Sequence, residues 1–141
     1  MLLKLNHLNQ AMALFGMWLG WYFGSMDGLL SLLIAVVMAD YVSGVLRAFY
    51  ENKLSSRVGR HGITKKVMIF VLVGIANLLD AHVFNMEHTV IRTATICFFV
   101  SNEGLSILEN AVAMGLRVPE SLKKSLKQIQ EEPTREDDKK Q

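Results

Sequence analysis

The polar residues that could do chemistry in this chain gather on one face of a helix predicted over residues 91–117. At about 100° per residue on a helix, their side chains fall within an arc of about 120°: Arg92, Thr95, Asn102, Glu103, Ser106, Glu109, Asn110 and Arg117. A segment of this length makes a helix of about 40 Å, which is long enough to cross a bilayer. Carboxylates are too costly for a surface that contacts lipid, so this face must contact protein or water. Such a face can bind ions or line a wetted pore.

Asp40 is a further ionisable residue that the sequence places at membrane depth. It follows Gly28 by about twelve residues in an otherwise uncharged block, where an unpaired carboxylate costs several kcal/mol. Arg47 shares its helix face but lies about 10 Å further along the axis, too far for a direct ion pair in a straight helix. We therefore expect Asp40 to face the bundle interior, a neighbouring protomer or water.

The sequence predicts no catalytic residue, metal site or cofactor. Asp80, His82, Glu87 and His88 crowd one predicted loop, but their spacing matches no ligand pattern with a mechanism behind it. No phosphate-binding loop, nucleophile elbow or zinc-protease signature is present in the sequence, and long apolar blocks leave no soluble domain for a catalytic pocket. The lone Cys97 lies on the apolar side of its helix, which favours a small buried hydrophobe over a reactive thiol.

The apolar residues fall into blocks that predict the elements carrying these groups. Of the 141 residues, 51% are hydrophobic, and the mean hydropathy is +0.28. Long blocks with few charges are typical of transmembrane helices. We predict an all-α integral membrane protein with four spans, the last one amphipathic, at about 8–26, 28–47, 65–80 and 91–110.

The C-terminal region predicts a different environment from the membrane domain, which we assign to residues 1–118. Pro119 suits the first turn of a new helix, and apolar residues then recur at spacings of three and four between lysines. Residues 119–130 are therefore predicted to form a short cytoplasmic amphipathic helix that lies along the inner leaflet or caps the bundle. Residues 131–141 mix both charge signs, which predicts a disordered tail.

Small residues in the first two spans predict close helix packing. Gly16, Gly20, Gly24 and Gly28 recur at every fourth position, and Gly44 lies in the second span. On a continuous helix the first four would form a groove through which backbones approach closely, a main source of helix association in lipid. The sequence leaves open whether the partner is a helix of the same chain or of a neighbour.

The predicted topology rests on the basic loop between the second and third spans. Its positive residues are Lys53, Arg57, Arg60, Lys65 and Lys66. The positive-inside rule places this loop in the cytoplasm, so both termini are predicted to be cytoplasmic and the turn at Asp27 to face outward. Each Lys or Arg near an anionic leaflet contributes about 1 kcal/mol of attraction, which makes membrane lipids expected partners.

Beyond these physical patterns, the chain from about residue 28 to 130 resembles the phage-lysis and toxin-secretion holin family. The resemblance rests on the order and spacing of short motifs: Ala39-Asp40-Tyr41-Val42-Ser43-Gly44, Lys53-Leu54-Ser55-Ser56, Gly62, Lys65-Lys66, Asn102-Glu103, Ser106-Ile107-Leu108-Glu109-Asn110, Gly115 and Pro119. It implies a non-enzymatic protein of the bacterial inner membrane that forms homo-oligomers. It also implies lesions through which an endolysin or a toxin escapes, without direct binding to that protein and without nucleic acid.

The resemblance gives the polar residues an expected role. We assign eight of them to the pore wall or the bundle interior: Asp40, Arg47, Arg92, Asn102, Glu103, Ser106, Glu109 and Asn110. Before opening they would pair within the bundle or between protomers, and opening would exchange those partners for water. The alternatives are a regulatory antiholin, a structural membrane scaffold, and a narrow ion or proton channel or small transporter subunit in which Asp40 and Glu103 conduct.

Overall fold

The computed structural model describes residues 2–53, 55–84 and 89–131, and within these ranges the chain is helical. The helices are α1 (Leu2–Phe23), α2 (Gly28–Tyr50), α3 (Ser56–His82), α4 (Val90–Ala113) and α5 (Glu120–Glu131). The prediction of an all-α chain is therefore confirmed for these residues. The predicted tail, 131–141, lies outside the described residues apart from Glu131.

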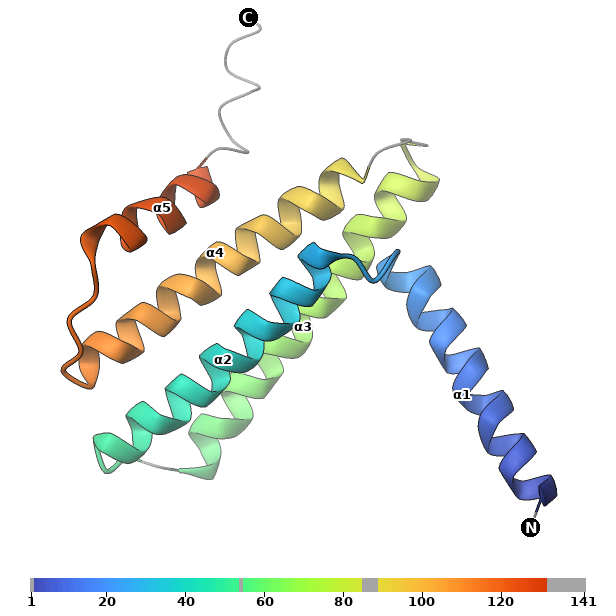
Figure 1. Cartoon of the computed structure of the whole chain (residues 1–141), viewed down its shortest axis with the longest axis horizontal. Coiled ribbons are helices and arrows are strands. Elements are labelled where there is room, and N and C mark those ends of the chain that lie inside the picture. Colours follow the sequence, from blue (N-terminus) through green and yellow to red (C-terminus); the bar gives the residue numbers. More distant parts are fainter. Residues whose placement is uncertain (1, 54, 85–88, 132–141) are drawn as a thin grey trace, which may run out of the picture.

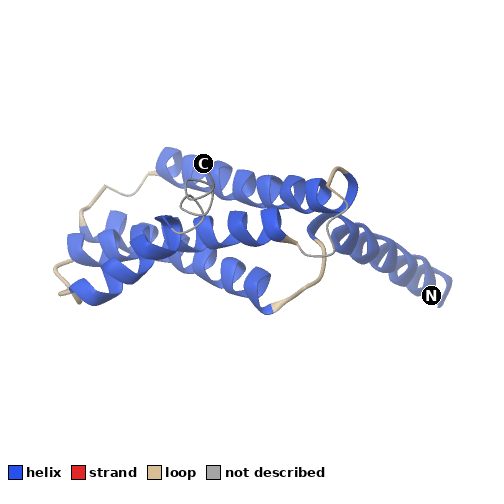
Figure 2. Ribbon diagram, turned by 90° about the horizontal axis from the view of Figure 1, so that it is seen from above, coloured by secondary structure: helices blue, strands red, loops and turns tan. Residues whose placement is uncertain are grey.

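Helices α2, α3 and α4 lie side by side and form a three-helix bundle (Figures 1 and 2). The apolar residues of α2 that face the bundle recur at helical spacings of three and four, so one stripe of the helix is buried. The buried core consists of Leu30, Leu33, Val37, Ile69, Val73 and Ile96. This core holds the three helices in a fixed register.

Helix α1 leaves the bundle and points away from it (Figure 1). It is attached through its last turn, where the Tyr22 hydroxyl donates to the Val71 carbonyl at 3.0 Å. The Asn77 amide also donates to the carbonyls of Trp21 and Tyr22, at 3.3 and 3.2 Å. The Tyr22 ring fits against α3 because residue 74 is a glycine, whose missing Cβ would overlap that ring. The first predicted span is thus helical, but it does not pack along the bundle.

The predicted glycine groove is interrupted in the structure. Helix α1 ends at Phe23, Gly24 adopts a left-handed backbone conformation with φ of +77°, and Gly28 begins α2. The prediction that all four glycines share one helix face is therefore wrong for Gly24 and Gly28. Packing of a neighbouring chain on Gly16 and Gly20, where an added Cβ would meet no atom within 4 Å, stays a prediction.

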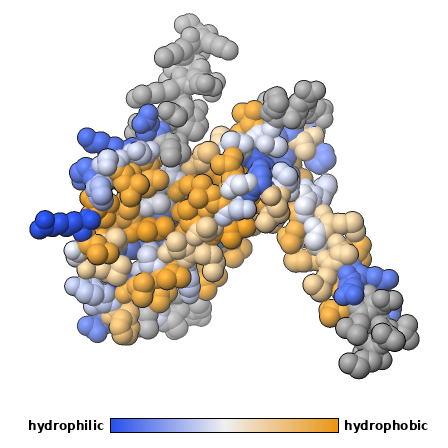
Figure 3. Space-filling model, viewed as in Figure 1, coloured by the Kyte–Doolittle hydropathy of each residue, from blue (hydrophilic) through white to orange (hydrophobic). Residues whose placement is uncertain are grey.

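Two of the predicted spans, 28–47 and 65–80, coincide with helices that are long and apolar enough to cross a membrane, Gly28–Tyr50 and Gly62–His82. Figure 3 shows hydrophobic residues over the middle of the bundle, with hydrophilic residues gathered at the end where α4 leads into α5. Whether α1 and α4 also cross the membrane stays a prediction.

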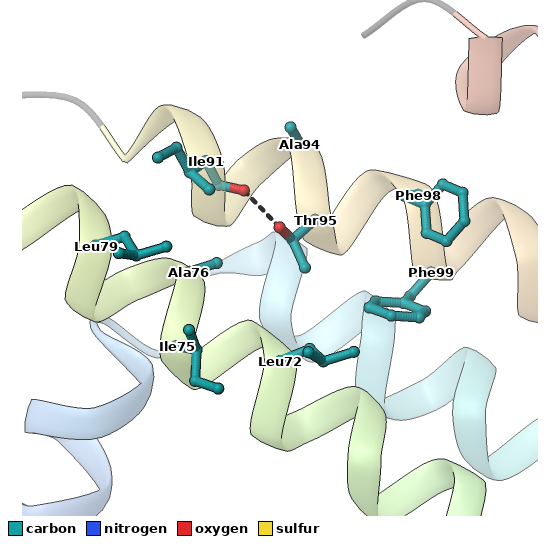
Figure 4. A pocket seen from close by; sticks show the side chains of 9 residues that line it. All are labelled: Leu72, Ile75, Ala76, Leu79, Ile91, Ala94, Thr95, Phe98 and Phe99. Carbon is teal, nitrogen blue, oxygen red and sulfur yellow. Dashed lines mark hydrogen bonds between the residues drawn. The ribbon is translucent and has the colours of Figure 1, made fainter. Parts of the chain in front are cut away.

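An apolar groove runs between α3 and α4 (Figure 4). Thr95 is the polar side chain in its wall, and its hydroxyl donates to the Ile91 carbonyl of its own helix at 2.7 Å. The surface of the groove is therefore apolar, because the Thr95 hydroxyl already donates its hydrogen within α4.

Helix α5 folds back along α4, and the predicted helix 119–130 corresponds to it. The Ser101 hydroxyl donates to the Leu126 carbonyl. The Leu126 side chain lies over Gly104, where an added Cβ would come within 3.1 Å of it. The small residue at 104 thus lets α5 approach α4 closely.

Candidate functional site

A buried ionic cluster joins the three helices of the bundle. The Lys66 ammonium of α3 donates to Asp40 Oδ2 of α2 at 2.6 Å and to Glu103 Oε2 of α4 at 2.5 Å. The exposed fractions of these side chains are only 15%, 12% and 10%. One cation therefore stands between two carboxylates, away from water.

These residues meet because each continues the buried stripe of its helix. Asp40 follows the core residue Val37 by three positions, and Glu103 follows Ile96 by seven. Lys66 precedes Ile69 by three. Residues three, four or seven positions apart lie on the same helix face, so the packing that forms the core also brings the charges together.

Asn110 extends the cluster by two helical turns, since it follows Glu103 by seven positions on α4. Its amide donates to Asp40 Oδ1 at 3.3 Å and to the Ser43 hydroxyl at 2.9 Å. Arg47 Nη1 donates to Asn110 Oδ1 at 3.5 Å. We call Asp40, Lys66, Glu103 and Asn110 the Lys66 cluster.

The charge balance of the Lys66 cluster makes it electrostatically demanding. Removing charges from water is expensive, and mutual attraction repays this only when each group is well paired. With one ammonium for two carboxylates, the cluster has an excess negative charge when all three groups are ionised. The stability of the cluster should therefore depend strongly on how well its charged groups are hydrated or paired.

A second cluster closes the other end of the core, around the buried Arg92. Its guanidinium donates to Asp27 Oδ2 at 2.7 Å, to the Phe23 carbonyl at 2.7 Å and to the Ser25 carbonyl at 2.8 Å. Asp27 also caps α2 by accepting from the Leu30 amide at 2.9 Å. The hydrogen bond from Arg92, followed by that from the Leu30 amide, holds the pKa of the Asp27 carboxyl below its usual value. Arg92 therefore clasps the turn between α1 and α2.

Asp80 positions Arg92 by capping α4 from the end of α3. Its carboxylate accepts hydrogen bonds from the backbone amides of Ile91 at 3.0 Å and Arg92 at 2.8 Å. Thr89, the residue at the start of α4, makes no capping bond with its side chain. A carboxylate at a helix N-terminus satisfies free amides and interacts favourably with the helix dipole. We call Asp27, Asp80 and Arg92 the Arg92 cluster.

The two clusters bracket a short apolar interior. Along α2, Asp27 and Asp40 are about 20 Å apart, and along α4, Arg92 and Glu103 are about 17 Å apart, less than the roughly 30 Å of bilayer hydrocarbon. The outer face of α2 nevertheless stays apolar beyond Asp40, as the exposed side chain of Phe49 shows. The Lys66 cluster thus lies inside the bundle, behind an apolar outer surface.

Comparison with known proteins places this arrangement in a family. The model of the bacteriophage holin family matches residues 17–131. The chain belongs to the bacteriophage holin family. The matched residues include both clusters and α5, and they leave out most of α1. As a holin-family member, the chain is a non-enzymatic membrane protein, which confirms that part of the prediction.

Similar proteins occur in several bacteria and in a phage. An uncharacterized protein of Listeria monocytogenes is 45% identical over 109 residues, which cover 77% of this chain and 76% of the relative. An uncharacterized 14.9 kDa protein of Clostridium perfringens is 37% identical, covering 89% of this chain and 94% of that one. A probable holin of Bacillus phage phi105 is 33% identical, covering 64% and 65%. No solved structure matches the chain.

In this holin-family chain the predicted polar face of α4 is divided between two surroundings. Glu103 and Asn110 are buried in the bundle, whereas Asn102 and Glu109 are exposed and Ser106 is half-buried. Three further residues were predicted to face the pore or the bundle. Asp40 belongs to the Lys66 cluster and Arg92 to the Arg92 cluster. Arg47 lies at the edge of the bundle, where it pairs with Glu51 at 2.8 Å. The predicted single stripe therefore has a paired inner part and an open outer part.

Lys66 is a candidate functional residue that sequence reasoning assigned to a different group. We predicted it to belong to the basic loop with Lys53 and Lys65; in the structure Lys53 pairs with Glu51 at 3.0 Å and Lys65 is exposed. The side chains of Arg57 and Arg60 lie outside the described residues. The signal that could have identified Lys66 is its spacing of three and seven positions before Ile69 and Val73, which are core residues of α3.

The loop that crowds histidines and carboxylates is described only in part. Glu87 and His88 lie outside the described residues, and Asp80 is engaged as the cap of α4.

Gly44, predicted as a packing position, faces α4, because an added Cβ would lie 3.8 Å from Asn110 Nδ2.

Proposed function

We propose that this chain is a lesion-forming holin of the bacterial inner membrane, a multi-pass protein with both termini in the cytoplasm. Copies accumulate, oligomerise and open lesions through which an endolysin or a toxin leaves the cell. Membership in the holin family supports this proposal, as does the similarity to a probable phage holin. The observation that carries it is the Lys66 cluster, an unevenly charged group held inside a membrane bundle.

The interior of one bundle leaves no passage for a folded enzyme. Side chains of the core fill the space between α2, α3 and α4, and interior packing in proteins leaves few voids larger than a water molecule. A lesion therefore requires several copies that separate or rotate their helices. This step distinguishes a holin from a narrow channel built within one bundle.

Opening is favoured by what each group gains in its new surroundings. Apolar core side chains that separate in a membrane contact lipid, so they lose packing but no hydrophobic driving force. Asp40, Lys66 and Glu103 regain water, which removes the desolvation cost of burying them. The cluster thus stores a driving force for opening that an all-apolar bundle would lack.

The exposed polar side chains of α4 extend the wettable surface. Asn102 and Glu109 lie outside the bundle in a single copy, and Ser106 lies between them and the Lys66 cluster. In an assembly these residues face water together with Glu103 and Asn110, and the apolar outer faces of α2 and α3 contact lipid. The wall of the lesion is then polar on one side and apolar on the other.

The decisive experiment co-expresses the chain with an endolysin that has no export signal of its own. We expect active endolysin outside the inner membrane, together with loss of potassium ions, after the chain has accumulated. Potassium loss while the endolysin stays inside would contradict the holin proposal and indicate a narrow channel. An unrelated membrane protein of similar size, expressed at the same level, controls for membrane damage caused by overexpression.

A matched pair of variants then tests the role of the Lys66 cluster. Glu103→Gln removes the excess carboxylate and leaves a neutral Lys66–Asp40 pair, so we expect delayed endolysin release at normal abundance. Glu109→Gln makes the same chemical change on the exposed side of α4, and we expect a much smaller delay. Equal timing in both variants would show that the cluster does not set the opening.

A further inference from the structure

A cavity of about 550 Å³ lies between the last turn of α2, the end of α4 and the first two turns of α5. These segments meet at the end of the bundle where α4 leads into α5 (Figure 1). The wall of the cavity consists of Arg47, Leu105, Leu108, Glu109, Val112, Ala113, Val118, Glu120, Lys123 and Lys127. In contrast to the groove between α3 and α4, this cavity combines an apolar part with a charged part.

The charged part of the cavity has one positive charge in excess. Three cations, Arg47, Lys123 and Lys127, face two carboxylates, Glu109 and Glu120. Glu51, which pairs with Arg47, also pairs with Lys53 outside the cavity wall, so these two further charges cancel and the excess of one remains. In the part of the chain that the structure describes, neither lysine of the wall and neither of its carboxylates forms an ion pair. A single phosphodiester, which carries one negative charge, would neutralise the excess.

Arg47 is oriented to take part in such binding. Its Nε donates to Glu51 and its Nη1 to Asn110, while Nη2 makes no hydrogen bond to the described residues. The bonds to Glu51 and Asn110 hold the guanidinium in place, so less side-chain entropy is lost when a ligand binds. Arginine also presents its donors in a planar fork that matches phosphate oxygens.

The apolar part of the cavity suits a hydrocarbon chain. Leu105, Leu108 and Val112 line it along α4, and Val118 closes it at the connection to α5. Phe49 and Tyr50 are exposed at the same end of α2, and aromatic side chains are enriched where a membrane helix meets the headgroup layer. The charged part therefore lies at the level of lipid headgroups.

We propose that this cavity binds an anionic phospholipid, with the phosphate at Arg47, Lys123 and Lys127 and part of an acyl chain along α4. Basic pockets between membrane helices on the cytoplasmic side are a known form of headgroup recognition. The bound lipid connects α5 to α2 and α4. This inference rests on the membrane location of the family and is independent of lesion formation.

The test uses the full chain reconstituted in phosphatidylcholine bilayers that contain a minor fraction of phosphatidylglycerol. The measured quantity is the relative affinity for spin-labelled phosphatidylglycerol over spin-labelled phosphatidylcholine. Lys123→Gln/Lys127→Gln should lower this preference about 30-fold, since each basic group near a headgroup contributes about fivefold. The matched control, Lys65→Gln/Lys124→Gln, removes the same charge from exposed side chains outside the cavity. It weakens the general attraction to the leaflet but leaves the bound phosphate all its partners, so its loss of preference should be at least threefold smaller.

Equal losses in the two double variants would overturn the proposal in favour of diffuse attraction to the membrane surface. Glu109→Gln/Glu120→Gln removes the negative charges of the wall and should raise the preference for phosphatidylglycerol, so that a folding defect cannot imitate the result. No rise in this variant would also contradict the proposal. Displacement of the labelled lipid by millimolar inorganic phosphate would assign the site to free phosphate and overturn the acyl-chain part.

Discussion

The Lys66 cluster and the Arg92 cluster both bury charge at the ends of one apolar core, but they satisfy it in different ways. Arg92 is matched by one carboxylate and two backbone carbonyls of the turn that it holds. The Lys66 ammonium forms its ion pairs with side chains, and one positive charge must neutralise two carboxylates. The first arrangement is a clasp whose partners are fixed by the fold, whereas the second depends on three helices staying together.

The difference has a physical consequence for where the bundle can open. Backbone partners move only when the turn unfolds, and Asp27 is partly exposed, with 36% of its side chain accessible. The side chains of Asp40, Lys66 and Glu103 are much less exposed, and the Lys66 ammonium is held by side-chain carboxylates rather than by backbone carbonyls. Separation of α2, α3 and α4 should therefore begin at the Lys66 end.

The largest expected effect is the loss of Lys66. Lys66→Met leaves Asp40 and Glu103 without their cation in a buried site, which should reduce the free energy of unfolding by about 3–5 kcal/mol. Thermal unfolding in detergent and the amount of protein in the membrane fraction measure it. Lys65→Met, a change at the exposed neighbour, is the control and should have little effect. Recovery is expected when Asp40→Asn and Glu103→Gln are added to Lys66→Met, and no recovery would refute the electrostatic explanation.

The loss of Arg92 should be the next largest effect. Arg92→Met removes three hydrogen bonds, but Asp27 and the carbonyls of the turn can be solvated in part, so we expect a loss of about 2–3 kcal/mol. Hydrogen exchange of the amides in residues 24–30 should increase, while exchange around Asp40 changes little. Arg92→Lys keeps the charge but not the three-way geometry, and an intermediate effect is expected. A larger loss than for Lys66→Met would reverse the comparison.

A smaller effect is expected from Gly24, which shapes the turn that Arg92 holds. With φ of +77°, Gly24→Ala forces a strained backbone, and its Cβ would lie 2.5 Å from Asn77 Oδ1. We expect a loss of about 1–2 kcal/mol in thermal unfolding. Gly20→Ala, in open surroundings on α1, is the control and should be neutral or slightly stabilising, because alanine favours helix. Equal destabilisation by both would mean that the turn geometry is unimportant.

The smallest expected effect is the contribution of Asp27 in the Arg92 cluster to the free energy of unfolding at acidic pH. The pKa of Asp27 is lowered from 3.8 in the folded chain, mainly by Arg92. Its contribution is therefore present above pH 3.8 and is lost as pH falls through the lower folded pKa. Because Asp27 is partly exposed, we expect this contribution to stay under about 1 kcal/mol. Asp27→Asn should flatten the decline of stability below pH 4, and an unchanged acid limb would contradict this role.

Hydrophobic periodicity was sufficient to predict the helices and to assign Asp40, Glu103 and Asn110, together with five other polar residues, to the pore wall or the bundle interior. It did not separate these bundle residues from the exposed Asn102 and Glu109. These residues interrupt apolar blocks, and a polar group at such a position must find a partner. The same reasoning failed for Lys66, because a pair of lysines after a basic loop is usually solvated. The spacing of Lys66 before Ile69 and Val73 was the available signal, and the contact between three helices shows that its side chain points inward.

The other differences between the predicted and the observed structure also come from contacts between segments that are far apart in the sequence. A spacing of four at Gly16, Gly20, Gly24 and Gly28 fits a helix, but Asn77 of α3 stabilises the turn that ends α1 after Phe23. The position of α5 depends likewise on the fit of its side chains to α4. Both features are tertiary, and propensity or periodicity gives no information about them.

The separation of α1 from the bundle determines how far a single copy reaches. Its 22 residues make a helix of about 33 Å, attached through its last turn and pointing away from the bundle (Figure 1). The footprint of the chain is thus much wider than that of its three packed helices. In a two-dimensional fluid, the collision frequency of diffusing molecules rises with their capture radius. In the proposed assembly, the outstretched helix would contact neighbouring copies while the bundles remain apart, so the first contacts between copies would form through α1.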